Sequence, residues 1–213
     1  MKIDPNNFEG FYHVLTGVVV PRPIAFISTI SADGVPNLAP FSFFSAVAYD
    51  PPTIVFSSAR RVGARQEKTK DTLVNIEATG EFVINVVVDD IAEAMNRTAA
   101  EYPAEVNEFE IAGLTATPSE VVAPPRVAES PVNMECRLSQ VVPIGRGERY
   151  WGLVIGEIVL LHIRDDLIDG HRINQEKLRP TGRLAGDMYC YTADTFELVR
   201  PVYDLSRGLP PIG

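Results

Sequence analysis

The sequence predicts a mainly β protein with peripheral helices, built around a small closed barrel. Segments rich in β-branched and aromatic residues recur along the 213 residues, and helix-like segments lie between them. The length and the hydrophobic content of 46% suit one soluble domain with a substantial core, and no internal repeat divides the chain. A barrel is expected because closure removes the unpaired sheet edges that promote aggregation. We therefore expect residues 1–213 to form a single domain.

Local residue preferences place the individual elements. Strands are expected at 17–20, 24–30, 53–57, 81–88, 132–142, 150–163 and 196–199. Helices are expected at 71–78 and 89–97, the second beginning with acidic residues that suit a helix start. Ala32-Asp33-Gly34 predicts a turn, and four prolines within 117–131 predict an extended surface connection rather than a domain boundary.

The overall charge and the cysteines limit the function classes. A net charge of −9 and a sequence pI near 4.9 disfavour nucleic acid and anionic membranes as partners. The first residues lack a signal peptide, and the longest apolar candidate, 151–163, is too short to span a bilayer as a helix, so we expect a cytoplasmic protein. Cys136 and Cys190 show no redox or metal spacing and are expected to be reduced core thiols.

A basic segment precedes the first predicted internal helix. Residues 60–70 carry five cations in this otherwise acidic chain. Asp71 or Thr72 can cap the helix, whose first-turn N–H groups and macrodipole favour an anion. Ser57 and Ser58, at the end of the preceding strand, add hydroxyl donors. Together these features predict a phosphate site, and the alternative is a solvated cationic loop that offsets the acidic surface.

The segment 37–45 is too apolar for an ordinary exposed loop. Pro40, Ser42 and Ser45 nevertheless argue against an uninterrupted core strand, so we expect backbone amides there to be available to a ligand. Arg22 lies between two prolines, and two interpretations remain open: it reaches a ligand, or it ties strands together.

Several stretches resemble the FMN-binding split-barrel family of flavin reductase-like proteins and flavoredoxins. The resemblance covers residues from about Tyr12 to Tyr191. It is carried by Val20–Thr29, Asp33-Gly34, Asn37–Ser45, Lys70–Ile76, Glu81–Asn85, Ile155–Ile158 and Arg179–Gly186, with Tyr189 after it. It implies an FMN-binding split barrel, a homodimer in most members, and non-covalent FMN.

The resemblance also implies roles for particular residues. Those implied beside the isoalloxazine ring are Asn37, Ala39, Ser42 and Phe43. Those implied near the ribityl chain or the phosphate are Ser28 or Thr29, Ser57, Arg60, Lys70 and Thr72, with Asp71 as a helix cap that orients them. Arg183 and Tyr189 are candidates for substrate or flavin contact, the alternative being a turn into the last strand. The alternative for the clustered phenylalanines is ordinary packing.

The expected function is an FMN-dependent, flavin reductase-like oxidoreductase, with NAD(P)H as the reductant. The alternative is a flavoredoxin-like electron carrier that receives electrons from a redox protein partner. One departure favours the alternative: many two-component flavin reductases have a Gly-Asp-His segment where this chain has Gly147-Glu148-Arg149. A third alternative is a barrel that binds a ligand other than flavin. It would require that the basic segment and the segment 37–45 occur together by coincidence. Dinucleotide, metal and serine hydrolase motifs are absent from the sequence.

Overall fold

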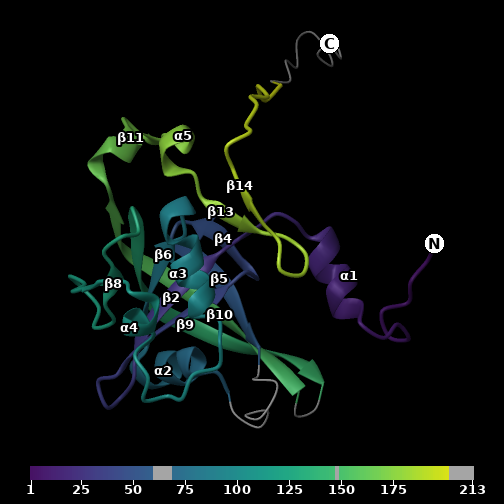
Figure 1. Cartoon of the computed structure of the whole chain (residues 1–213), viewed down its shortest axis with the longest axis horizontal. Coiled ribbons are helices and arrows are strands. Elements are labelled where there is room, and N and C mark those ends of the chain that lie inside the picture. Colours follow the sequence, from purple (N-terminus) through teal and green to yellow (C-terminus); the bar gives the residue numbers. More distant parts are fainter. Residues whose placement is uncertain (60–68, 147–148, 202–213) are drawn as a thin grey trace.

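The computed structural model describes residues 1–59, 69–146 and 149–201. Its centre is a seven-stranded antiparallel sheet with helices on the outside (Figure 1). In spatial order the strands are β3 (Pro36–Phe41), β2 (Ala25–Ile30), β6 (Glu81–Val86), β9 (Val132–Arg146), β10 (Arg149–Ile163), β5 (Pro52–Ala59) and β4 (Phe44–Tyr49). The expected mainly β class with peripheral helices is confirmed.

The two edge strands of the sheet are consecutive in the chain. Only Ser42 and Phe43 separate the end of β3 from the start of β4. The sheet must therefore curl until its edges approach each other at this corner, as in a barrel. The Ser57 N–H donates to the Phe43 carbonyl over 2.9 Å and fixes the corner to β5. The interruption expected within 37–45 is this corner.

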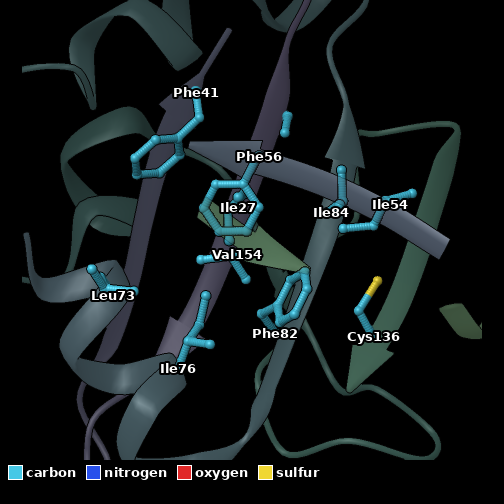
Figure 2. Close-up of a cluster of buried hydrophobic side chains, with 11 residues drawn as sticks. Ile27, Phe41, Ile54, Phe56, Leu73, Ile76, Phe82, Ile84, Cys136 and Val154 are labelled. Carbon is cyan, nitrogen blue, oxygen red and sulfur yellow. The ribbon is translucent and has the colours of Figure 1, made fainter. Parts of the chain in front are cut away.

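The barrel interior holds the main hydrophobic core. Its buried members are Ala25, Ile27, Phe41, Ile54, Phe56, Leu73, Ile76, Phe82, Ile84, Cys136 and Val154 (Figure 2). Two glycines of β10 allow close approach to this core. A Cβ at Gly152 would lie 2.7 Å from Leu73 Cδ2, and a Cβ at Gly156 would overlap the ring of Phe82. Glycine at these positions lets α2 and β6 pack directly against β10.

Helices and short strands surround the barrel. They are α1 (Phe11–Val18), β1 (Arg22–Pro23), α2 (Asp71–Thr79), η1 (Asp89–Ile91), α3 (Ala92–Arg97), α4 (Glu108–Ala112), β7 (Ala116–Thr117), β8 (Arg126–Val127), η2 (Asp165–Leu167), β11 (Ile168–Asp169), β12 (Arg172–Ile173), α5 (Gln175–Leu178), β13 (Thr181–Arg183) and β14 (Tyr189–Tyr191). A second core of Ile24, Phe26, Leu38, Val87, Val88, Ile91, Met95, Phe109 and Val127 lies beneath α3 and α4. Strand β2 is consequently buried on both faces.

Several expected elements differ in the structure. Residues 17–20 were expected to form a strand, but 11–18 form helix α1; Val18, Val19 and Val20 are exposed, so no packing supports their β propensity. Residues 196–199 are outside any strand and their apolar side chains are exposed. The helix expected at 89–97 begins with the 3-10 turn η1. Strand β9 continues to Arg146, beyond the predicted end at 142.

The proline-rich connection contains a short hairpin and is held to the barrel by a buried carboxylate. Strand β7, at the start of this connection, pairs with strand β8 inside it. Glu135 is fully buried and accepts backbone N–H groups of Glu120, Val121 and Val122 at 2.7–3.1 Å. His162 Nε2 lies 2.6 Å from the same carboxylate. These partners hold the pKa of Glu135 below its ordinary value, although burial alone would raise it.

The two cysteines occupy different environments. Cys136 is buried in the main core, and its burial raises the pKa of its thiol well above the ordinary value, with Glu135 adding to the effect. Cys190 is half-buried in β14, so the expectation of two core thiols is met by Cys136 alone. In the described parts of the chain, no helix is long and apolar enough to cross a membrane.

Candidate functional site

Arg22 holds together the segments at one end of the barrel. Its Nη1 donates to the carbonyls of Thr16 and Val19, at 2.5 and 2.7 Å, at the end of α1. Its Nη2 donates to the Leu184 carbonyl at 2.9 Å, and its Nε donates to Ser42 Oγ at 3.3 Å. Arg22 therefore connects α1, the loop after β13 and the β3–β4 corner, and Figure 1 shows α1 beside that loop. These contacts show that Arg22 ties segments of the fold together, which is one of the two interpretations left open by the sequence.

A cavity of about 550 Å³ lies where these segments meet, and we call it the large cavity. Its lining comes from α1, β1, the β3–β4 corner, α3 and the β13–β14 hairpin. The residues that line it are Tyr12, His13, Thr16, Arg22, Ile24, Pro40, Phe41, Ser42, Met95, Asn96, Ala99, Arg183, Leu184, Gly186, Asp187 and Tyr189. Aromatic rings and two guanidinium groups give it an apolar wall and positive charge, a combination that suits a planar ligand with polar edges.

Arg183 and Tyr189 contact each other in the lining of the large cavity. The Arg183 guanidinium lies over the Tyr189 ring, 4.3 Å from its centroid. The Tyr189 hydroxyl donates to Asn96 Oδ1 at 3.0 Å and links the hairpin to α3. Arg183 also donates to the Gly186 carbonyl, which closes the loop on itself. The structure therefore brings both predicted substrate-contact residues to the cavity, and their function there stays a prediction.

A smaller cavity of about 130 Å³ adjoins the large one at the start of α2, and we call it the small cavity. Pro40 and Ala99 line both cavities, so the two are neighbours. Asn37, Ala39, Lys70, Asp71 and Thr72 line it, together with residues 98–102 and Glu108. Among the described residues that line it, Lys70 supplies the positive charge, and its Nζ lies 5.4 Å from the centroid of the Phe41 ring.

A buried polar network supports the start of α2. Asn37 Nδ2 donates to Thr72 Oγ1 at 3.0 Å and to Thr29 Oγ1 at 3.3 Å. Asn75 Nδ2 donates to the same Thr29 hydroxyl at 3.0 Å. All four residues are buried, so each hydrogen bond satisfies a group that water does not reach. The network fixes the first turn of α2 against β2 and β3, with Thr29 behind the cavity wall.

The helix start differs from the sequence prediction in one respect. Lys70 occupies the N-cap position, and no side chain caps the helix there. Asp71 is the first helical residue, where its negative charge favours the positive end of the helix dipole. The expectation that Asp71 or Thr72 caps the helix is therefore wrong. The Thr72 hydroxyl is used instead in the network with Asn37.

Some predicted site residues do not line either cavity. Ser28 Oγ donates to the Pro125 carbonyl at 2.5 Å and accepts from Asn85 Nδ2, so its side chain is committed to the proline-rich connection. This contact follows from strand alternation, because Ser28 and Thr29 point to opposite faces of β2. Phe43 stacks on Trp151, with centroids 5.6 Å apart and planes 12° apart. Arg60 lies outside the described residues.

Ser57 and Ser58 also lie outside the cavity linings, but they differ in burial. Ser57 is half-buried on the face of β5 opposite to Phe56. Ser58 is buried on the same face as Phe56, and its Oγ has no hydrogen-bond partner among the described residues. A buried unpaired hydroxyl is costly unless a ligand or water satisfies it. The hydroxyl that needs a further hydrogen-bond partner is therefore that of Ser58 and not that of the predicted Ser57.

Sequence reasoning missed the contribution of α1 and α3 to the large cavity. Tyr12, His13 and Thr16 come from α1, which had been assigned in part to a strand. Met95 and Asn96 come from α3, a helix that was expected but not connected to the site. The periodic apolar pattern of residues 11–18 was the available signal for α1. No local pattern indicated which helix faces reach the cavity.

The family of the chain follows from comparison with known proteins. Residues 17–179 match the model of the flavin reductase like domain. An uncharacterized protein of Halalkalibacterium halodurans is 42% identical over 212 residues, which cover 97% of this chain and 100% of that protein. The chain therefore belongs to the flavin reductase-like family, and the predicted resemblance is confirmed.

Solved structures agree with this assignment. Nitrilotriacetate monooxygenase component B from Bacillus cereus is 38% identical, with a TM-score of 0.88 and coverage of 93% of this chain and 98% of that one. The 2-nitrobenzoate 2-nitroreductase NbaA of Pseudomonas fluorescens is 32% identical, with a TM-score of 0.86 and full coverage of both chains. A split barrel domain protein from Shewanella frigidimarina, 23% identical with a TM-score of 0.79, supports the split-barrel fold.

Proposed function

We propose that the protein binds FMN non-covalently and acts as a flavin reductase-like oxidoreductase. The observation that carries the proposal is that the two cavities are neighbours, with Pro40 and Ala99 in the lining of both. The large cavity offers aromatic walls and guanidinium groups to a flat ring system. The small cavity offers Lys70 and the N-terminal end of α2 to a phosphate. A flavin mononucleotide has these two parts at its two ends.

The residues present fit this cofactor at several points. Lys70 and Thr72 line the small cavity, at the proposed phosphate end. Asn37 and Ala39 line the small cavity, and Ser42 lines the large one. Ser28 is excluded from this set because its hydroxyl is committed to Pro125.

Bound flavin supplies the redox chemistry, accepting and donating a hydride equivalent or single electrons. The protein residues bind and orient it and limit the access of water. Asn37 and Thr72 hold the floor of the small cavity in position, while Arg22 holds the two flanking segments of the large cavity. NAD(P)H is the proposed reductant, and a hydride transfer from it requires close, aligned approach to the flavin in the large cavity, which Arg183 and Tyr189 line.

The visible spectrum of the purified protein tests the cofactor. We expect a yellow protein, or a colourless one that takes up added FMN, and denaturation should release the chromophore because no covalent link is present. Chromatography of the released flavin against FMN, FAD and riboflavin standards identifies it. A protein that remains colourless after incubation with all three flavins would contradict the proposal.

Anaerobic stopped-flow spectroscopy tests the activity separately. The FMN-loaded protein is mixed with NADH, NADPH or dithionite, and bleaching of the flavin is followed. Reduction by NAD(P)H within roughly a second, an ordinary turnover time, supports the reductase. Rapid reduction by dithionite with slow reduction by both nicotinamides supports the electron-carrier alternative, which the missing Gly-Asp-His segment favours.

We also propose that the protein is a homodimer, as the resemblance implies. Edge strand β4 exposes most of its side chains, including Val47 at 57% and Tyr49 at 94%. An exposed apolar edge strand is a ready surface for association with a second copy. Light scattering at low micromolar concentration should give the mass of two chains. Val47→Glu should shift the protein to a monomer, and a wild-type monomer would contradict the proposal.

A further inference from the structure

Arg22 is a buried cation that has no carboxylate partner among the described residues. The residue is only 6% exposed, and no Asp or Glu lies within 4.0 Å of its guanidinium in the described parts of the chain. Its hydrogen-bond acceptors are three backbone carbonyls and the Ser42 hydroxyl. Most buried charges are paired with an opposite charge because solvation by water is lost. Carbonyl oxygens at the end of α1 compensate part of this loss through the helix dipole.

The other charges around Arg22 do not neutralise it. Arg183 lines the same cavity, and its like charge disfavours the charged form of Arg22. Burial is the larger cause of the lowered pKa of Arg22, and Tyr12 acts in the opposite direction. Asp187 is the one carboxylate among the described residues that line the large cavity, but its side chain is fully exposed and its Oδ1 lies 4.0 Å from Arg183 Nη2. The cavity therefore carries net positive charge.

One N–H group of Arg22 Nη2 has no hydrogen-bond acceptor among the described residues. A guanidinium carries five N–H groups, two of them on Nη2. Among the described residues, Nη2 makes a single hydrogen bond, to the Leu184 carbonyl. The Arg22 guanidinium also lies 6.0 Å from the centroid of the Phe43 ring, at the corner where β3 meets β4. Arg22 thus combines a wall position in the large cavity, an unneutralised charge and a remaining donor.

We infer that Arg22 stabilises a negative charge on the reduced flavin and thereby raises the reduction potential of the cofactor. This inference rests on the proposed function. Oxidised flavin is neutral at its ring; two electrons and one proton give a reduced ring with one negative charge. A positive charge that is fixed and poorly hydrated lowers the energy of this anion more than that of the neutral oxidised ring. The protein therefore binds reduced flavin more tightly than oxidised flavin.

The expected size of the effect follows from electrostatics. Opposite unit charges separated by about 8 Å, roughly the width of the large cavity with its volume of about 550 Å³, attract each other at an effective dielectric constant of about 20 enough to change a binding ratio by roughly thirtyfold. Removal of the charge should therefore weaken the preference for reduced flavin by roughly ten- to thirtyfold. For a two-electron couple this equals a fall in potential of about 30–45 mV.

Three variants separate the charge of Arg22 from its structural role. Arg22→Gln removes the charge and the forked donors, whereas Arg22→Lys keeps the charge and loses the fork. Arg164→Gln removes an exposed cation whose partner is Asp166, outside both cavities, and serves as the control. The midpoint potential of FMN bound to each protein is measured by equilibration with a redox dye. Affinity for oxidised FMN is measured in parallel.

The inference predicts a lower potential for Arg22→Gln, little change for Arg22→Lys and none for Arg164→Gln. Equal potentials in all four proteins, with weaker FMN binding in both Arg22 variants, would show that Arg22 only holds α1 and the loop after β13. Loss of affinity for an aromatic carboxylate such as benzoate, at unchanged potential, would assign the charge to a substrate and also overturn the inference. Wild-type protein that binds no flavin would instead contradict the proposed function.

A second measurement keeps the inference testable if Arg22→Gln does not fold. Reduced FMN bound to the wild-type protein is titrated with acid under anaerobic conditions, and its absorbance spectrum reports protonation of the ring. We expect bound reduced flavin to remain anionic below the pKa of free reduced FMN measured in the same buffer. Protonation at the same or a higher pH than in free FMN would contradict the inference.

Discussion

Asn37 Nδ2 donates to Thr72 Oγ1 over 3.0 Å, and this buried hydrogen bond joins strand β3 to the first turn of helix α2. The two residues are 35 positions apart in the chain, yet both line the small cavity. Because the same amide also donates to Thr29, the floor of the cavity is held by side chains from β2, β3 and α2 together.

Loss of the Thr72 hydroxyl should therefore destabilise the protein. Thr72→Val leaves one N–H of Asn37 buried without an acceptor, which costs about 1–3 kcal/mol. Thr72→Ser keeps the hydroxyl and is the matched control. Urea unfolding monitored by circular dichroism measures both. A valine variant as stable as the serine variant would show that the network adds nothing to stability.

Lys70 should distinguish FMN from riboflavin, since the two ligands differ only in the phosphate. Lys70→Ala removes a charge-assisted contact and should weaken FMN binding by about 1.5–3 kcal/mol, roughly ten- to hundredfold. Riboflavin binding should barely change. Lys177→Ala, an exposed lysine of α5, is the control. Isothermal titration calorimetry with both flavins decides; equal losses would indicate that Lys70 supports the fold rather than the phosphate.

Gly156→Ala should destabilise the barrel core. The added Cβ would overlap the Phe82 ring, which is fully buried and packs edge-on against Phe56. Overpacking of this kind costs about 1–3 kcal/mol. The double variant Gly156→Ala, Phe82→Leu should recover part of the loss because the smaller side chain leaves room. Thermal unfolding of the wild type, both single variants and the double variant gives the coupling, and additive losses would refute the overlap.

Glu135 should make the stability dependent on acid pH. Its folded-state pKa lies below the ordinary value of 4.5, because three backbone N–H groups and His162 outweigh the cost of burial. The stability it contributes is therefore present above about pH 4.5 and is lost as the pH falls through the lower folded-state value. Glu135→Gln should be less stable than wild type at pH 7 by about 1–3 kcal/mol, with a smaller difference at pH 3.

Urea unfolding at several pH values between 3 and 7 measures this dependence. Glu105→Gln, at an exposed position before α4, is the control and should follow the wild-type curve. If Glu135→Gln kept the full acid sensitivity of the wild type, other carboxylates would be responsible for it.

Strand-rich patterns and the family motifs predicted the barrel well, because β-branched residues cluster where strands are buried. Helix α2 was predicted at 71–78 and observed at Asp71–Thr79, since its apolar face is periodic and Gly80 ends it in a left-handed conformation. The strand expected at 17–20 was wrong because its valines are exposed at the end of α1, so β propensity there is not supported by packing.

The site was less accessible to sequence reasoning than the fold. Asn37, Lys70 and Thr72 were placed together because they belong to family motifs. The sequence did not show toward which face of the sheet each serine side chain points, because adjacent residues on a strand face opposite sides. Ser28 contacts the proline-rich connection. Ser58, and not Ser57, faces inward. The contribution of α1 depends on the contacts of Arg22 with Thr16 and Val19, which no local pattern encodes.

The unequal burial of the two cysteines makes the native protein behave as if it had a single labelling site. Cys136 is enclosed in the core with a raised thiol pKa, so little reactive thiolate is present or accessible. Cys190, the other of the two cysteines in the chain, is half-buried in β14, next to Tyr189. A maleimide dye should therefore add once to the folded protein and twice after denaturation. Such a dye would report movements of the β13–β14 hairpin without any engineered residue.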